Sequence, residues 1–463
     1  MTIVATNPSE YAAPSPEALE EYLSNLVQNV GVPGISVTIV SDSNNLTVSA
    51  GTTDIGGGAP IGPRSRFAVS CLGRLLTAAA VLLLEQKGSL NLEAPIADYV
   101  PGLEKRDSHN CDPIRVAHLL SQTSGYLGPS VDRTIRSWDD AAAFFCETPQ
   151  LFWPGTVFSE QNLDYVILGQ LVRAVTGRSA ADLVCETVLT PLGIVAGTSA
   201  DDRSDPDAYV RGHRIADGRS IERLDFSPID DLWAPAISNH TMSTDGLARL
   251  QRALTCESEG GIFTRETLNR LRNPSVILPN THSVRRNKDW VVSAFGLGCA
   301  HFANGLLGFV SAGLGQCTAA MFHPQVQSSS ALGMNIEAPL IRTMVQDYLC
   351  RYLSGQTIER APVRRLPIKN GFNFTEFING FSPRELSGRY LGGDEHTVIV
   401  RAQSDRIILE ISDGKKIVLG ELQRGKAFFQ SDFPASVGFF KCGLEPALRF
   451  GMKSYRKLAR KHG

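Results

Sequence analysis

Residues 67–88 read FAVSCLGRLLTAAAVLLLEQKG, from Phe67 to Gly88. Within this segment, the ten residues from Leu75 to Leu84 form the longest largely apolar stretch of the chain. A helix that crosses a membrane needs about 20 apolar residues, so the stretch predicts a buried helix over residues 72–87 instead. Glycine commonly ends helices, so this helix is expected to end at Gly88 and to carry Cys71 at its N-terminus.

Apolar spacing and β-branched runs predict further elements on both sides of this helix. Helical spacing is found over residues 16–30, 162–176 and 338–353, and strand-like runs are found over 34–40, 46–50, 291–298 and 308–323. After residue 355, short β-type runs follow one another at residues 397–401, 406–411, 416–422 and 427–430. Turns separate these runs, which is typical of a small antiparallel barrel or sandwich.

Length and composition limit the class of protein. The chain has 463 residues, of which 43% are hydrophobic and 20% charged, which excludes wholesale disorder and favours a large domain with a smaller one. The 45 basic and 47 acidic residues leave a net charge of −2, so no overall positive charge favours nucleic acid as a partner. We predict a loose tail over residues 1–15, a main domain over 16–355, a linker over 356–385 and a small β-barrel domain over 386–463.

The nine cysteines are widely spaced and include no Cys-x-x-Cys pair. Neither a basic segment nor an apolar one opens the chain, so no secretory signal is visible. Both observations favour reduced thiols in a cytoplasmic protein without a membrane partner. Cys299, Cys317, His301 and His323 lie near one another in the sequence, but their spacing matches no zinc pattern. We therefore expect no metal and no cofactor.

Several motifs in a fixed order resemble one known family. Residues 67–102 resemble the signature helix of the serine β-lactamase and penicillin-binding-protein family, in its class C and esterase-like branch. The further motifs are VPG at 32–34, HLLSQTSG at 118–125, PGTVFS at 154–159, YVILG at 165–169, TPLG at 190–193 and STD at 243–245. The resemblance covers about residues 20–350, and the β-rich region after it resembles the lipocalin-like appendix of some family members.

The resemblance implies a fold and an activity. The fold would be an α/β (α+β) sandwich, in which helices cover a mainly antiparallel sheet and a helical lobe lies beside it, with a cleft at their junction. A small all-β domain would follow. The activity would be acyl transfer to the serine of a Ser-x-x-Lys motif, assisted by a Tyr-x-Asn motif and by a Lys/His-x-Gly strand.

The sequence departs from the family at all three motifs. With Phe67 and Thr77 setting the register, Cys71 occupies the position of the nucleophilic serine and Arg74 that of the lysine. Residues 160–162 read Glu-Gln-Asn where the family has Tyr-Ser-Asn, and residues 311–313 read Ser-Ala-Gly where it has His-x-Gly. Asn162 and Gly313 therefore match the pattern, whereas Glu160 and Ser311 replace its reactive side chains.

A thiol at the start of a helix suits nucleophilic chemistry. The positive end of the helix and the cation of Arg74, three residues on, both favour the thiolate form of a cysteine. Arginine stays protonated and cannot act as a base, but it could hold a thiolate or an oxyanion. The N–H groups at Cys71 and near Gly313 could form an oxyanion hole. The alternative is that Cys71 is a small buried filler. Ser70 would be the nucleophile only if the register slipped by one.

Three other residues are candidates for the same site. Glu160 could act as general acid or base or orient the substrate, although an ion pair with Arg74 would make its role structural. His240 could serve as a base for a cysteine, and the alternative is an ordinary loop histidine. Ser311 could donate a hydrogen bond to a carboxylate or carbonyl group of a ligand, together with Asn162 and Gly313. The alternative is an ordinary strand serine.

Three functions remain open from the sequence. The first is acyl transfer or hydrolysis of a small-molecule ester, amide or thioester through Cys71, in secondary metabolism. The second is a cyclase, isomerase or lyase that uses Glu160, His240 and Arg74. The third is an inactive relative that binds a ligand or partner. β-Lactam hydrolysis is disfavoured because the Ser-x-x-Lys motif is missing. The expected partner is a small molecule, and the oligomeric state stays open.

Overall fold

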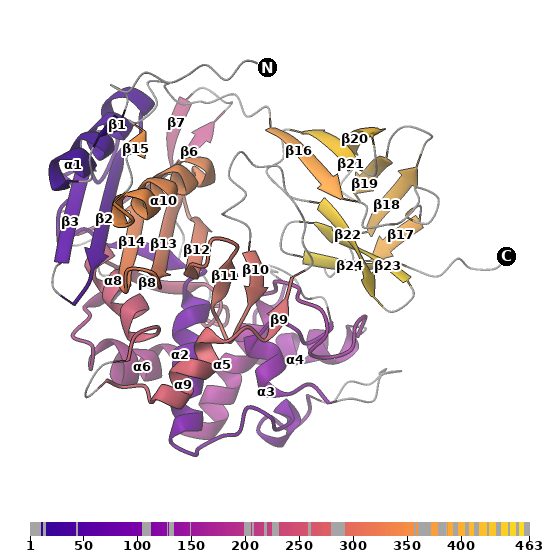
Figure 1. Ribbon diagram of the computed structural model, residues 1–463. Helices are drawn as coiled ribbons and strands as arrows, with labels where there is room; N and C mark the ends of the chain where they lie inside the picture. Colours follow the sequence, from indigo (N-terminus) through magenta and orange to yellow (C-terminus); the bar gives the residue numbers. More distant parts are fainter. Residues whose placement is uncertain are drawn as a thin grey trace. The chain divides into compact units, whose positions relative to one another are not determined.

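The computed structural model is shown in Figure 1. It describes residues 11–12, 15–42, 45–103, 113–126, 128, 134–148, 150–198, 205, 208–216, 220–224, 231–257, 261–278, 292–355, 358–359, 372–377, 386, 388–391, 397–402, 407–411, 416–423, 426–431, 437–442, 445–450 and 453–457. The chain forms two compact units, each built from three segments: residues 1–83, 181–269 and 305–369 make the first, and 84–180, 270–304 and 370–463 the second.

The first unit is built on an antiparallel sheet. Its strands lie in the order β3–β2–β14–β13–β12. Their bounds are β3 (Asn45–Gly51), β2 (Gly34–Val40), β14 (Ser328–Met334), β13 (Gln316–His323) and β12 (Leu307–Gly313). Every residue of β2, β13 and β14 is buried, so the sheet is covered on both faces.

Helices from distant parts of the sequence cover this sheet (Figure 1). α8 (Thr244–Ala253) packs on β2, β13 and β14, and its Thr244 hydroxyl is hydrogen-bonded to those of Ser36 and Thr38 on β2. α1 (Pro16–Asn25) lies against β3, and α10 (Pro339–Leu353) lies against β13 and β14. The rings of Tyr22 and Tyr348 stack at 3.8 Å, which joins α1 to α10.

A smaller sheet in the first unit leads into the helix of the predicted site. Its strands are β4 (Phe67–Ser70), β8 (Ser238–Met242) and β5 (Ala196–Thr198), in the order β4–β8–β5. β4 is followed by α2 (Gly73–Gln86), and the residues from Leu72, just before the helix, to Val81 are almost fully buried. This unit also contains a π-helical turn η2 (Leu26–Val30), the hairpin β6 (Gly212–Ala216) and β7 (Ser220–Leu224), and the π-helical turn η4 (Cys185–Leu189) after α6 (Ala180–Val184).

The second unit contains a helical part and three short strands. α3 (Val116–Leu120) and α4 (Trp138–Glu147) pack against α5 (Leu163–Thr176). β9 (Val276–Ile277) pairs with β10 (Val292–Phe295), and β10 pairs with β11 (Ala300–Phe302). α9 (Arg265–Arg272) precedes β9, and a short 3-10 helix η3 (Ile96–Asp98) precedes α3.

The C-terminal region forms a nine-stranded antiparallel sheet. Its strand order is β16–β21–β20–β19–β18–β17–β24–β23–β22. The bounds are β16 (Phe372–Phe377), β17 (Gly388–Leu391), β18 (Thr397–Ala402), β19 (Ile407–Ile411), β20 (Lys416–Gln423), β21 (Lys426–Ser431), β22 (Val437–Cys442), β23 (Glu445–Phe450) and β24 (Lys453–Lys457). The two outermost strands, β16 and β22, also contact each other, so the sheet curves round toward a barrel.

The predicted fold class, with helices, a mainly antiparallel sheet and a small all-β region, is confirmed. One predicted element is wrong: residues 308–323 form two strands and not one. A tight turn at Leu314 and Gly315, with φ angles of 60° and 72°, separates β12 from β13. The domain boundaries stay predictions, because most of residues 1–15 and 356–385 lie outside the described ranges. β1 (Tyr11–Ala12) and β15 (Ile358–Glu359), which are described, pair with each other.

No helix in the described part of the chain combines the length and the apolarity that crossing a membrane requires.

Candidate functional site

Cys71 lies on a strained turn between a strand and a helix. β4 ends at Ser70 and α2 begins at Gly73. Ser70 has a φ angle of 49°, in the left-handed region that a residue with a side chain seldom occupies. Such strain persists where the surrounding structure holds it, and it is common at functional sites. The Cys71 side chain is half-buried, whereas Ser70 is 3% exposed. The turn therefore presents the thiol and hides the neighbouring hydroxyl.

Ser311, on β12, holds the Cys71 turn through its side chain. The backbone N–H of Cys71 donates to Ser311 Oγ at 3.2 Å. Arg342 donates to the backbone carbonyl of Ser311, also at 3.2 Å, which ties this part of β12 to α10. Because Ser311 Oγ accepts the Cys71 N–H, its own hydroxyl proton points elsewhere and can be donated. The backbone N–H of Cys71, which is expected from the sequence to lie in an oxyanion hole, is thus hydrogen-bonded to Ser311 in this structure.

Arg74 lies beneath the same turn and is 1% exposed. Its Nε donates to the backbone carbonyl of Cys71 at 3.4 Å, and its guanidinium carbon lies 5.0 Å from the centre of the Phe309 ring. The ring face attracts the cation. The described contact of Arg74 is therefore with the main chain of Cys71, and it places a permanent positive charge at the start of α2.

Two glycines allow neighbouring strands to approach the turn. A Cβ atom on Gly73 would lie 2.6 Å from the backbone nitrogen of Ser238, so β8 packs directly against the start of α2. A Cβ atom on Gly313 would lie 3.6 Å from Ser70 Oγ, which is ordinary contact. Gly313 ends β12 just before the turn at Leu314, whose positive φ angle is rare for a bulky residue.

His240, on β8, contacts a cysteine that sequence reasoning did not name. Its Nδ1 lies 2.8 Å from Ser238 Oγ and its Nε2 lies 3.4 Å from the sulfur of Cys185. Burial lowers the pKa of His240 and favours the neutral ring. Burial, with a contribution from Asp182, raises the pKa of Cys185. Cys185 and His240 are 55 residues apart, so no local sequence signal could have paired them.

Glu160 and Asn162 lie in the second unit and are described there. Glu160 is half-buried, and Asn162 is the N-terminal cap residue of α5. Between them, the backbone N–H of Gln161 donates to the Gln122 side chain at 3.0 Å. The Gln161 amide donates in turn to Ser124 Oγ at 2.7 Å and to the buried carboxylate of Asp164 at 3.1 Å. Residues 160–162 are thus held by a buried polar network.

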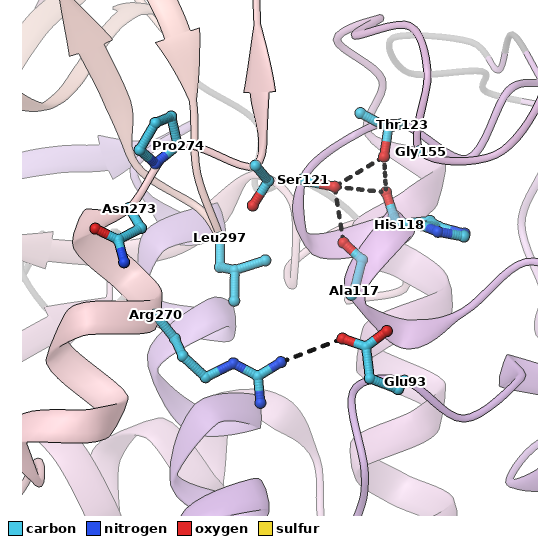
Figure 2. Close-up of a pocket in the computed structure, with 11 residues that line it drawn as sticks. Glu93, Ala117, His118, Ser121, Thr123, Gly155, Arg270, Asn273, Pro274 and Leu297 are labelled. Atoms are coloured by element: carbon cyan, nitrogen blue, oxygen red, sulfur yellow. Dashed lines mark hydrogen bonds and ion pairs between the residues drawn. The ribbon is translucent and has the colours of Figure 1, made fainter.

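The second unit also contains a cavity of about 370 Å³ (Figure 2). Figure 2 shows Arg270 facing Glu93 across it, and the two form an ion pair of 3.4 Å. The Ser121 hydroxyl is hydrogen-bonded to the carbonyl of Ala117 and to the hydroxyl of Thr123. Arg270 also contacts Glu85 at 2.5 Å. The positive charge of Arg270 is therefore already balanced by the carboxylates of Glu85 and Glu93. None of the sequence-predicted site residues lines this cavity.

Among the described residues, no group of three or more histidine, cysteine, aspartate or glutamate side chains could hold a metal ion.

Comparisons with known proteins identify relatives of the chain. The sequence profile described as Beta-lactamase matches residues 19–339. Penicillin-binding protein 4 of Amycolatopsis lactamdurans is 31% identical over 166 residues, which are 35% of this chain and 44% of that protein. The chain thus matches less than half the length of this relative.

Solved structures share the fold at low sequence identity. The crystal structure of SurE has a TM-score of 0.74 at 21% identity, and the alignment covers 96% of this chain and 99% of that one. A class C β-lactamase mutant has a TM-score of 0.59 at 16% identity, covering 73% of this chain and 96% of that one. SurE therefore matches nearly the whole chain, including the C-terminal sheet.

Proposed function

This chain belongs to the Beta-lactamase family, whose members are generally hydrolases or acyltransferases, and we propose that it transfers or hydrolyses an acyl group through Cys71. The substrate class is a small-molecule ester, amide or thioester. The Ser-x-x-Lys motif on which family members rely is replaced, so the proposed nucleophile is a thiol and not a hydroxyl.

The observation that carries the proposal is the conformation of the Cys71 turn. The backbone at Ser70 is strained, and the next residue, Cys71, is half-buried while Ser70 is buried, so the thiol is the more accessible of the two groups. Strain of this kind is common at functional sites, which supports a functional role for the turn. The arrangement also favours Cys71 over Ser70 as the nucleophile, which agrees with the register set by Phe67 and Thr77.

The bond-making and bond-breaking steps of the proposed reaction begin at Cys71, in the first unit. The Cys71 sulfur attacks the carbonyl carbon, a C–S bond forms, and the carbonyl electron pair moves to oxygen. The resulting oxyanion takes the Cys71 N–H in place of Ser311 Oγ, which lies 3.2 Å from that nitrogen. When the oxyanion collapses, the bond to the leaving group breaks and the acyl group stays on sulfur. Water or another acceptor then releases it.

Supporting roles follow from the same contacts and from the sequence. Ser311 keeps a hydroxyl proton to donate to the substrate. Arg74 stabilises the turn through the Cys71 carbonyl and supplies a fixed positive charge. Glu160 is proposed, on its position in the Tyr-x-Asn motif, to take the thiol proton and return it to the leaving group.

Intact-protein mass spectrometry with activated esters and thioesters tests the proposal. A p-nitrophenyl ester should add one acyl group to the chain, and peptide mapping should locate it on Cys71. Cys71→Ala should abolish the adduct, whereas Cys256→Ala, which removes another half-buried thiol, should leave it intact. An unchanged adduct and unchanged turnover in Cys71→Ala would refute the thiol mechanism and favour the cyclase, isomerase or lyase hypothesis.

The role of Glu160 has its own test. Glu160→Gln keeps the size of the side chain and removes its charge. We expect a slower approach to the acyl adduct, by about a hundredfold or more if Glu160 is the general base. Unchanged acylation and deacylation rates would remove Glu160 from the mechanism and leave Cys71 in it.

A further inference from the structure

A second thiol in the first unit has the arrangement of an activated nucleophile. Cys185 Sγ and His240 Nε2 are 3.4 Å apart, and His240 Nδ1 lies 2.8 Å from Ser238 Oγ. A nucleophile in reach of a base, with the base oriented by a third group, is the general pattern of an activated side chain. We infer that Cys185 and His240 form a second reactive dyad, a covalent modification site for small neutral electrophiles of the α,β-unsaturated carbonyl class.

The backbone holds Ser238 and His240 together on β8 and brings Cys185 to them from a separate element. His240 pairs with Thr198 in the sheet of β8 and β5. Its own N–H donates to Ser238 Oγ at 3.1 Å, so the serine hydroxyl is held beside the ring. Cys185 begins the π-helical turn η4, an irregular geometry that is frequent at functional sites. Both Cys185 and His240 are half-buried, so a small molecule can reach the sulfur.

The protonation of the pair selects the chemistry. Burial favours the neutral thiol and the neutral imidazole, so the dyad holds one proton to transfer and no net charge. With Nδ1–H donating to Ser238, Nε2 is left to accept the thiol proton. Addition across a polarised double bond suits such a pair, because sulfur bonds to the β-carbon while the proton passes through His240 to the α-carbon. No oxidant and no leaving group is needed.

Charge near the sulfur selects the electrophile. Asp182 is exposed, and its negative charge contributes to the raised pKa of Cys185. An anionic electrophile would be repelled by this carboxylate, whereas a neutral one would not. The half-burial of Cys185 further restricts the site to small molecules. These two features separate the dyad from Cys71, which lies at the start of α2 with Arg74 beneath it.

Labelling with N-ethylmaleimide tests the inference in the full chain. The experiment uses a Cys71→Ser background, so its result does not depend on the proposed function. With limiting reagent, peptide mass spectrometry gives the rate at each thiol, and Cys256 and Cys350, which are also half-buried, serve as internal references. We expect Cys185 to react fastest, and His240→Gln to slow it at least about tenfold while both references keep their rates.

If His240→Gln unfolds the chain, all three thiols will react faster and the variant will not test the dyad. Two further comparisons then test it. Ser238→Ala should slow Cys185 by a smaller factor. A maleimide that carries a carboxylate should react more slowly than N-ethylmaleimide at Cys185, and Asp182→Asn should remove that difference. A Cys185 rate no higher than those of Cys256 and Cys350, or one indifferent to His240 in a folded chain, would overturn the dyad.

Discussion

Replacing Gly73 by alanine should change the free energy of unfolding through two opposing effects, a gain in helix propensity and a steric clash with β8. Gly73 is the first residue of α2, and alanine is favoured over glycine in helix interiors by about 1 kcal/mol, which is the upper limit of the gain at this position. The new methyl group would, however, lie 2.6 Å from the backbone nitrogen and 2.7 Å from the Cβ atom of Ser238. Carbon atoms pack best at about 3.5–4.0 Å, so β8 and α2 must separate by roughly 1 Å.

The steric cost should exceed the gain in helix propensity. Overpacking of a filled core costs about 1–3 kcal/mol, and Ser238 belongs to a buried strand that cannot rotate away as a flexible side chain could. The net expectation is a loss of about 1–2 kcal/mol in the free energy of unfolding. Ser238 also pairs with Ser70, so the same displacement should change the alkylation rate of Cys71.

Urea unfolding of Gly73→Ala measures this balance, and Gly62→Ala is its control. No atom lies within 4 Å of a Cβ placed on Gly62, so this variant should unfold at nearly the urea concentration of the natural chain. The Gly73 variant should unfold at a lower concentration. A midpoint equal to or above that of the natural chain would refute the close approach of β8 to α2.

Burial lowers the pKa of His323 to about 4. Because the unfolded chain binds the proton more readily, the free energy of unfolding should fall by up to about 3 kcal/mol as pH drops from 6.5 to 4. His323→Gln should flatten this part of a plot of unfolding free energy against pH. Burial works to raise the pKa of Asp54, but hydrogen bonds and the charge of Arg223 lower it overall. Asp54→Asn should therefore lower the free energy of unfolding by about 1 kcal/mol near neutral pH, and this loss should shrink as pH falls through the carboxyl pKa. An equal loss at all pH values would contradict a stabilising role of the Asp54 carboxylate. Tyr165→Phe removes the bond from the hydroxyl to the Leu120 carbonyl at 2.9 Å and should cost about 1–3 kcal/mol in urea unfolding, whereas no loss would mean that the carbonyl finds another donor.

The sequence predicts those elements of the fold whose signal is local. The helix expected over residues 72–87 is found as α2 at Gly73–Gln86, because its apolar run and its terminal glycine are both short-range features. The hairpin of β12 and β13 is missed because Leu314 occupies a left-handed turn position that leucine rarely takes. Gly313 and Gly315 flank it, but a glycine inside a strand-like run can equally mark a bulge or a close approach of backbones, so the turn signal is ambiguous.

The candidate site is predictable in its residue types but not in its contacts. The register of Phe67 and Thr77 suffices to single out Cys71 and Arg74. The bond between Cys71 and Ser311 joins residues 240 positions apart, and only the folded sheet brings them together. The pairing of His240 with Cys185 has the same origin, since β5 and β8 must assemble before the two side chains can meet.

The packing of α1 against α10 has a consequence for synthesis of the chain. The hydroxyl of Tyr348 donates to the carbonyl of Ala18, across 330 residues, and the two helices cover one sheet. During translation, α1 therefore leaves the ribosome long before α10, and its apolar side stays uncovered until α10 has been synthesised. Contacts of such long range slow folding, and nascent chains with exposed apolar surface aggregate. A chain that ends before residue 339, and so lacks α10, should accordingly depend on chaperones during translation.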